Sequence, residues 1–155
     1  MLAPARALAL ALPAVLLGSV LAMQYLGGFV PCEMCHWQRW PHYAALAAAV
    51  LAILLRASAA SRPLTILAGL LIMASGVIGV FHAGVEYGWW PGPAHCTAPA
   101  LSGSGDMLRQ ILAAPLVRCD VPQWTLFGVS LAGWNALFSL AGGATVLILA
   151  TRRPR

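Results

Sequence analysis

Four long apolar runs constrain this chain more than any other feature of its sequence. They cover residues of about 7–26, 37–55, 64–83 and 124–150. A helix of ~20 apolar residues crosses the ~30 Å hydrocarbon core of a bilayer. Charged residues make up only 8% of the chain, against about a quarter in a soluble domain. The sequence therefore predicts an all-α membrane protein, in which residues 1–155 form a single four-transmembrane-helix bundle.

The first apolar run, about residues 7–26, has an alternative interpretation, because a signal peptide also places an arginine before an apolar stretch. The apolar core of a signal peptide is typically about 7–15 residues long. The run in this chain is longer, and we therefore expect it to be a transmembrane helix.

The arginines predict the orientation of the bundle in the membrane. The chain has no lysine, so its nine basic residues are all arginines, and its net charge is +5. Six arginines and no acidic residue lie on one side of the predicted helices, and three arginines and all four acidic residues lie on the other. Arginine excess marks the cytoplasmic side, so both termini are expected there. Scattered arginines do not form a basic patch, which argues against a nucleic-acid partner.

The cysteines all fall in the two segments that this orientation places outside. Cys32 and Cys35 lie in a loop of about 27–36, and Cys96 and Cys119 lie in a loop of about 84–123. Disulfides form and persist in the oxidising compartment outside the cytoplasm. The sequence therefore predicts redox or structural disulfides on that side.

The second outside loop also predicts a short amphipathic helix that lies along the membrane surface. Ser104 or Asp106 can cap it, and Pro115 stops it. Its apolar residues fall on one helical face, at positions 107, 108, 111 and 112.

The segment PCEMCHWQRW, residues 31–40, contains two motifs with different chemistries. Cys32 and Cys35 form a CxxC pair, which is typical of a redox-active dithiol, whereas the same pair followed by His36 is the attachment pattern of c-type haem. The haem interpretation leaves the second iron ligand unidentified and gives Cys96 and Cys119 only a separate structural role. In a third interpretation, both cysteine pairs are inert disulfides that hold the outside loops. We favour disulfide exchange, because it uses all the cysteines.

Arg39 follows Cys35 by four residues, so on a helix its guanidinium could reach the Cys35 thiolate. It could equally extend to lipid headgroups. Pro41 complicates the first interpretation, because a helix that begins only at the proline would remove this spacing. We expect His42 to pack between helices. His82 ends the third apolar run, where an interface residue is favoured over a proton carrier.

Three segments together resemble the DsbB family of disulfide bond formation proteins. They are PCEMCHWQRW, FHAGVEYGWWPGPAHC and RCDVPQWTLFGVSLAGWNALFSL. The resemblance covers the whole chain, and it implies a quinone-dependent thiol oxidase of the bacterial inner membrane, with its cysteines in the periplasm. It also implies that the protein reoxidises a thioredoxin-like, DsbA-like partner and uses ubiquinone or menaquinone as its cofactor.

The resemblance also implies roles for individual residues. Cys96 and Cys119 correspond to the pair that faces the partner protein, and Cys32 and Cys35 correspond to the pair near the quinone. Exchange between the pairs is then expected through Cys119 and Cys32. Arg39 occupies the position of the family's quinone-contacting arginine. Cys96 follows a Gly-Pro-Ala stretch, so we expect its sulfur to be the more exposed one of the loop pair.

Overall fold

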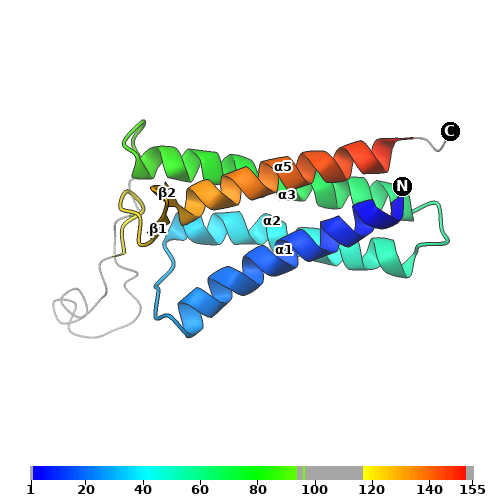
Figure 1. The fold of residues 1–155 in the computed structure, drawn as a ribbon, viewed down its shortest axis with the longest axis horizontal. Coiled ribbons are helices and arrows are strands. Elements are labelled where there is room, and N and C mark those ends of the chain that lie inside the picture. Colours follow the sequence, from blue (N-terminus) through cyan, green and yellow to red (C-terminus); the bar gives the residue numbers. More distant parts are fainter. Residues whose placement is uncertain (1, 94–95, 97–116, 153–155) are drawn as a thin grey trace, which may run out of the picture.

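The computed structural model describes residues 2–93, 96 and 117–152 of the chain. In these residues it contains four helices and a two-stranded hairpin. The helices are α1 (Leu2–Tyr25), α2 (Glu33–Leu54), α3 (Ser61–Glu86) and α5 (Leu131–Thr151), and the strands are β1 (Thr125–Leu126) and β2 (Val129–Ser130). Figure 1 shows the helices side by side in an elongated bundle. The predicted surface helix, at residues 104–115, lies outside the described residues.

Three of these helices, α1, α3 and α5, are long and apolar enough to cross a membrane. The helix α2 is less apolar than these three, because polar side chains interrupt its apolar sequence. Most of them are buried against the other helices: Gln38, Arg39 and His42. The fold is therefore helical as predicted, with the polar residues of one helix directed into the bundle.

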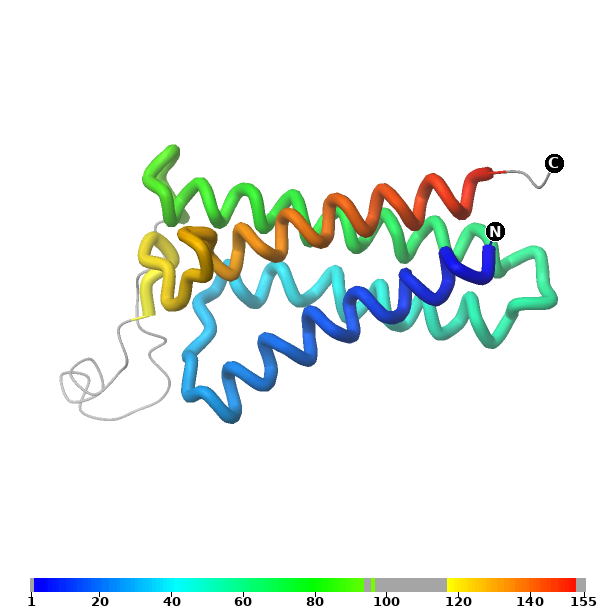
Figure 2. Tube along the Cα trace, in the orientation of Figure 1, coloured from blue at the N-terminus to red at the C-terminus, as the bar shows by residue number. Residues whose placement is uncertain are grey.

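The two ends of the bundle differ in what they carry. The start of α1, the end of α5 and the turn between α2 and α3 lie at one end (Figures 1 and 2). The α1–α2 connection, the end of α3 and the hairpin lie at the other. Because Cys32 precedes α2 directly, the CxxC pair lies at the end opposite to the chain termini.

The helices extend beyond several of the predicted spans. The helix α1 begins at Leu2 rather than near residue 7, and α3 covers Ser61–Glu86 rather than 64–83. The apolar runs mark the part of each helix that suits hydrocarbon, and hydrogen bonding continues the helix past them. Pro63 lies in the first turn of α3, where its missing N–H costs no intrahelical hydrogen bond.

The predicted start of the second helix was too late, since α2 begins at Glu33 and not near residue 37. Cys32 is its N-cap, and the Cys32 sulfur accepts a hydrogen bond from the backbone N–H of Cys35 at 3.2 Å. Pro41 lies inside the helix and does not start it. Cys35 and Arg39 are therefore one helical turn apart, and the spacing argument holds.

The predicted start of the last helix, near Trp124, was wrong. A hairpin occupies this segment, and Phe127 and Gly128 form its turn with positive φ angles of 52° and 77°. Two consecutive positive φ values are typical of a two-residue hairpin turn. Ser130 then caps α5 by accepting a hydrogen bond from the N–H of Gly133 at 3.1 Å.

Small residues allow α3 and α5 to pack closely. A Cβ added at Gly79 would lie 3.0 Å from the carbonyl oxygen of Ala132, and one added at Gly143 would lie 3.0 Å from the carbonyl oxygen of Gly69. Such contacts let helix backbones approach each other, which favours helix association where water does not drive it. This packing holds α3 and α5 against each other.

Candidate functional site

The CxxC pair lies at the first turn of α2, where Cys32 is buried and Cys35 is partly exposed. The two sulfurs are 2.7 Å apart and are not joined. The hydrogen bond with Cys35 and the burial of Cys32 raise the pKa of the Cys32 thiol. Cys32 therefore keeps its proton more readily, and Cys35 is the sulfur better able to carry the negative charge.

The second cysteine pair lies against the first. Cys96 and Cys119 form a disulfide, and both belong to one apolar cluster with Cys32. The other buried members of the cluster are Met34 and Val85. Segments that are far apart in the sequence therefore bring all the cysteines to one place, as disulfide exchange requires.

Cys96 is the more exposed cysteine of the loop pair, in the order predicted, but both cysteines are buried. Cys96 is 5% exposed and Cys119 is 1% exposed, so the cluster buries both. The Cys119 sulfur also lies 3.3 Å from the carbonyl oxygen of Cys96. The apolar cluster covers the disulfide.

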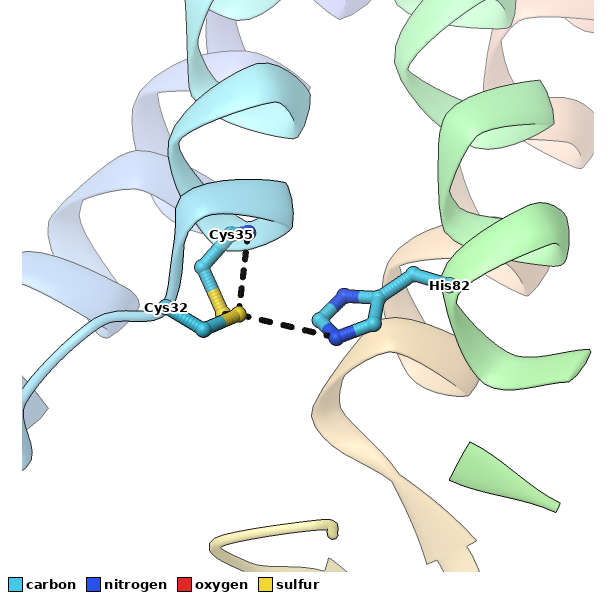
Figure 3. Close-up of side chains that lie close together, drawn as sticks. All are labelled: Cys32, Cys35 and His82. Atoms are coloured by element: carbon cyan, nitrogen blue, oxygen red, sulfur yellow. Dashed lines mark hydrogen bonds between the residues drawn. The ribbon is translucent and has the colours of Figure 1, made fainter. Parts of the chain in front are cut away.

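His82 is part of the site, although its position in the sequence favoured an interface residue over a proton carrier. It is 2% exposed rather than at an interface, and its Nε2 lies 3.6 Å from the Cys32 sulfur. Figure 3 shows the imidazole of α3 pointing at the CxxC pair of α2. Glu86, one turn later on α3, places Oε1 3.8 Å from the same Nε2. The spacing of His82 and Glu86 at the end of an apolar run was the signal available in the sequence.

A buried polar network continues from His82 across the bundle. Gln38 Nε2 lies 2.7 Å from His82 Nδ1, and Gln38 Oε1 accepts a hydrogen bond from Asn135 Nδ2 at 2.8 Å. Asn135 Oδ1 in turn lies 3.0 Å from His42 Nε2. His42 therefore packs between helices as predicted, and the network connects α2, α3 and α5.

Arg39 is buried and its described hydrogen bond goes to α1. Its Nη1 donates to Gln24 Oε1 at 2.6 Å. Arg39 does not extend outward, so the prediction that it could bind headgroups does not fit its position. Its guanidinium lines the same cavity as Cys35, which leaves it available to a ligand there.

This cavity has a volume of about 360 Å³ and opens beside the CxxC pair. All four described helices contribute to its lining, together with the segment before α5. Most of its lining is apolar, and its few polar groups include Gln24, Arg39 and His42. A mainly apolar cavity with a few placed polar groups is typical of a site for a small organic ligand. Its size and composition suit the headgroup of a quinone.

The ligand atoms of Cys32, Cys35 and His82 lie within 4.8 Å of one another, which is also a possible arrangement for a metal ion. A histidine ligates a metal through an unprotonated nitrogen, and its other nitrogen usually donates to an acceptor. Here the amide nitrogen of Gln38 faces Nδ1, so the proton is placed on Nε2, toward Cys32. This arrangement favours a hydrogen bond over metal binding.

Comparisons with known proteins agree with one another. The family model of disulfide bond formation protein DsbB matches residues 3–149. Disulfide bond formation protein B of Polaromonas sp. strain JS666 is 35% identical, over 98% of this chain and 94% of that protein. An uncharacterized protein of Rickettsia prowazekii, RP370, is 22% identical, over 81% of this chain and 74% of that protein. No solved structure matches.

Proposed function

This chain belongs to the DsbB family of disulfide bond formation proteins, and on this basis we propose that it is a quinone-dependent thiol oxidase. It reoxidises a thioredoxin-like partner of the DsbA type and passes the electrons to ubiquinone or menaquinone. The observation that carries the proposal is the single cluster in which Cys96 and Cys119 meet Cys32, beside the cavity that Cys35 lines. A haem attached to Cys32 and Cys35, with His36 as an iron ligand, would not use the second cysteine pair.

The proposed electron path begins at the partner's reduced thiols. A partner thiolate attacks the Cys96–Cys119 disulfide, and the partner leaves as a disulfide with both loop thiols reduced. The Cys119 thiolate then attacks Cys32 of an oxidised Cys32–Cys35 pair, and Cys35 departs as the thiolate. Cys96 attacks Cys119, which restores the loop disulfide and frees Cys32.

A quinone bound in the cavity would supply the two-electron acceptor. Arg39 and Gln24 are placed to hold its polar headgroup, and the apolar residues of α1 and α5 suit its ring and tail. Cys35 lines the cavity as the sulfur better able to carry negative charge. The positive charge of Arg39 stabilises that thiolate within the apolar surroundings.

We propose further that all four helices span the bacterial inner membrane, with the cysteines in the periplasm and both termini in the cytoplasm. The helix α2 joins the other three as a span because its polar side chains are buried in the bundle. The arginine distribution supports the orientation. An oxidising compartment for the cysteines is also what stable disulfides need.

The proposed activity is tested by disulfide formation in the partner. The purified protein is mixed with a reduced DsbA-type oxidase, with and without ubiquinone, and the free thiols of the partner are counted over time. Continuous loss of partner thiols is expected only when both the protein and quinone are present. Equal rates without quinone would reject a quinone-dependent oxidase.

Replacement of Arg39 is expected to weaken quinone binding. Arg39→His should raise the apparent KM for quinone about 10- to 100-fold, which corresponds to the loss of one hydrogen bond to a charged group. Exchange between the partner and the loop disulfide should be nearly unchanged. Steady-state kinetics at varied quinone concentrations measure both effects.

Two matched variants show whether the charge or the packing of Arg39 matters. Gln24→Leu removes the hydrogen bond to Arg39 and the headgroup contact of Gln24 itself, but it leaves the charge of Arg39, so it should raise KM less. Arg56→His changes an exposed arginine at the other end of the bundle and should have no effect. An unchanged KM in Arg39→His would remove Arg39 from the quinone site.

A further inference from the structure

His82 contacts a reacting sulfur and has no part in the electron path described above. Its Nε2 lies 3.6 Å from the Cys32 sulfur, and the backbone of Cys119 also lies against its imidazole. The imidazole therefore contacts the Cys32 sulfur and the backbone of Cys119, the two residues that are proposed to exchange. A histidine in this place either accepts the proton of Cys32 or donates a hydrogen bond to its sulfur, depending on the tautomer.

The buried network fixes the tautomer. Asn135 Nδ2 donates to Gln38 Oε1 at 2.8 Å and to the carbonyl oxygen of Ser75 at 3.2 Å. Gln38 Nε2 donates to the carbonyl oxygen of Met34 at 3.2 Å. Both amides are thus oriented by backbone carbonyls, and the second N–H of Gln38 is directed at His82 Nδ1. Because Nδ1 accepts, the proton of the neutral imidazole is on Nε2, facing Cys32.

We propose that His82 is a catalytic residue of the exchange, whose Nε2–H donates a hydrogen bond to the Cys32 sulfur as that sulfur leaves Cys119. The proposal rests on the proposed function. In the step concerned, the Cys96 thiolate attacks Cys119, the Cys96–Cys119 bond forms and the Cys119–Cys32 bond breaks. The electron pair of the broken bond stays on Cys32, where the N–H of His82 stabilises it.

Gln38 acts through His82 and is therefore a positioning residue. It holds Nδ1 as an acceptor, and without it the imidazole could turn its lone pair toward Cys32. A hydrogen bond donor at a leaving thiolate speeds its departure, since a more stable thiolate leaves faster. Besides His82, the groups that face the Cys32 sulfur are Cys35 on α2, Glu86 on α3 and the Cys96–Cys119 disulfide.

The test measures the ionisation of Cys32 directly and needs neither quinone nor partner. In a Cys35→Ser protein with the Cys96–Cys119 disulfide intact, Cys32 is the single free thiol. Its thiolate is followed by ultraviolet absorbance against pH, with a protein that also carries Cys32→Ser as the blank. His82→Met, which removes the N–H at similar size, should raise the Cys32 pKa by about one to two units.

Three further variants in the same background separate hydrogen bonding from other causes. His82→Gln retains an N–H donor, so the Cys32 pKa should stay close to its value with His82 present. Gln38→Met should raise the pKa of Cys32, as His82→Met does. Glu86→Gln removes a nearby negative charge and should lower the Cys32 pKa.

An unchanged Cys32 pKa in His82→Met, or an equal rise in His82→Gln, would overturn the proposal. If His82→Met does not fold, Gln38→Met decides alone. If the quinone assay fails but His82→Met raises the Cys32 pKa as expected, the proposed function is rejected and the hydrogen bond from His82 to Cys32 stands.

Discussion

A protein with Cys35→Ser is expected to lose quinone reduction completely. Cys35 is the cysteine of the CxxC pair that is partly exposed and lines the cavity beside Arg39. Without its sulfur, Cys32 has no partner with which to form the disulfide that releases two electrons. The rate of quinol formation should therefore fall to that of a sample without protein.

The same variant is also expected to keep its first reaction with the partner. The Cys96–Cys119 disulfide is intact, so it should oxidise about one equivalent of reduced partner in a burst and then stop. Quinol absorbance and partner thiols are measured in the same sample. Continued quinol formation by Cys35→Ser would show that the electrons leave the protein by another route.

The second large effect concerns the sulfur that the partner attacks. Exchange proceeds through a mixed disulfide, which the second thiol of the partner normally resolves. A thioredoxin-like partner that lacks this thiol should therefore be trapped on Cys96. The complex should disappear on reduction and should not form with Cys96→Ser. Mass spectrometry of the linked peptides identifies the attacked sulfur.

The burial of the loop disulfide adds a requirement for the partner's attack that the sequence did not indicate. Both sulfurs of the loop disulfide are buried beside Cys32, so the partner has to displace part of the cluster to reach Cys96. Trapping should accordingly be slower with the free protein than with a short unstructured disulfide peptide as the target. A link on Cys119 would mean that the order of electron flow through the loop disulfide is reversed.

Much of the fold could be predicted because apolar length is a strong signal. The runs of about 20 apolar residues located α1, α3 and α5. The hairpin before α5 was missed, since Trp124, Leu126 and Phe127 also continue an apolar run. Its turn depends on the positive φ angles of two residues, which hydrophobicity does not reveal.

The polar part of the site could be predicted only in part. The cysteines stand out by residue type, and Arg39 stands out in an apolar run. His82 and Gln38 do not, because a polar residue in a span can face lipid headgroups, a neighbouring helix or a ligand. The rotation of α2 and α3 about their own axes decides which of these surroundings a polar side chain faces. The packing of the helices sets that rotation. The helix starts at Glu33 after the Cys32 cap, and within it Gln38 Nε2 lies 2.7 Å from His82 Nδ1.

The most direct test of the central claim is the ratio of the two products under anaerobic conditions. Reduced partner, purified protein and excess ubiquinone are mixed without oxygen, and quinol and partner disulfide are measured over many turnovers. One quinol per partner disulfide is expected, because each disulfide releases two electrons and each quinone accepts two. Partner disulfide formed without an equivalent amount of quinol would contradict a quinone-dependent oxidase.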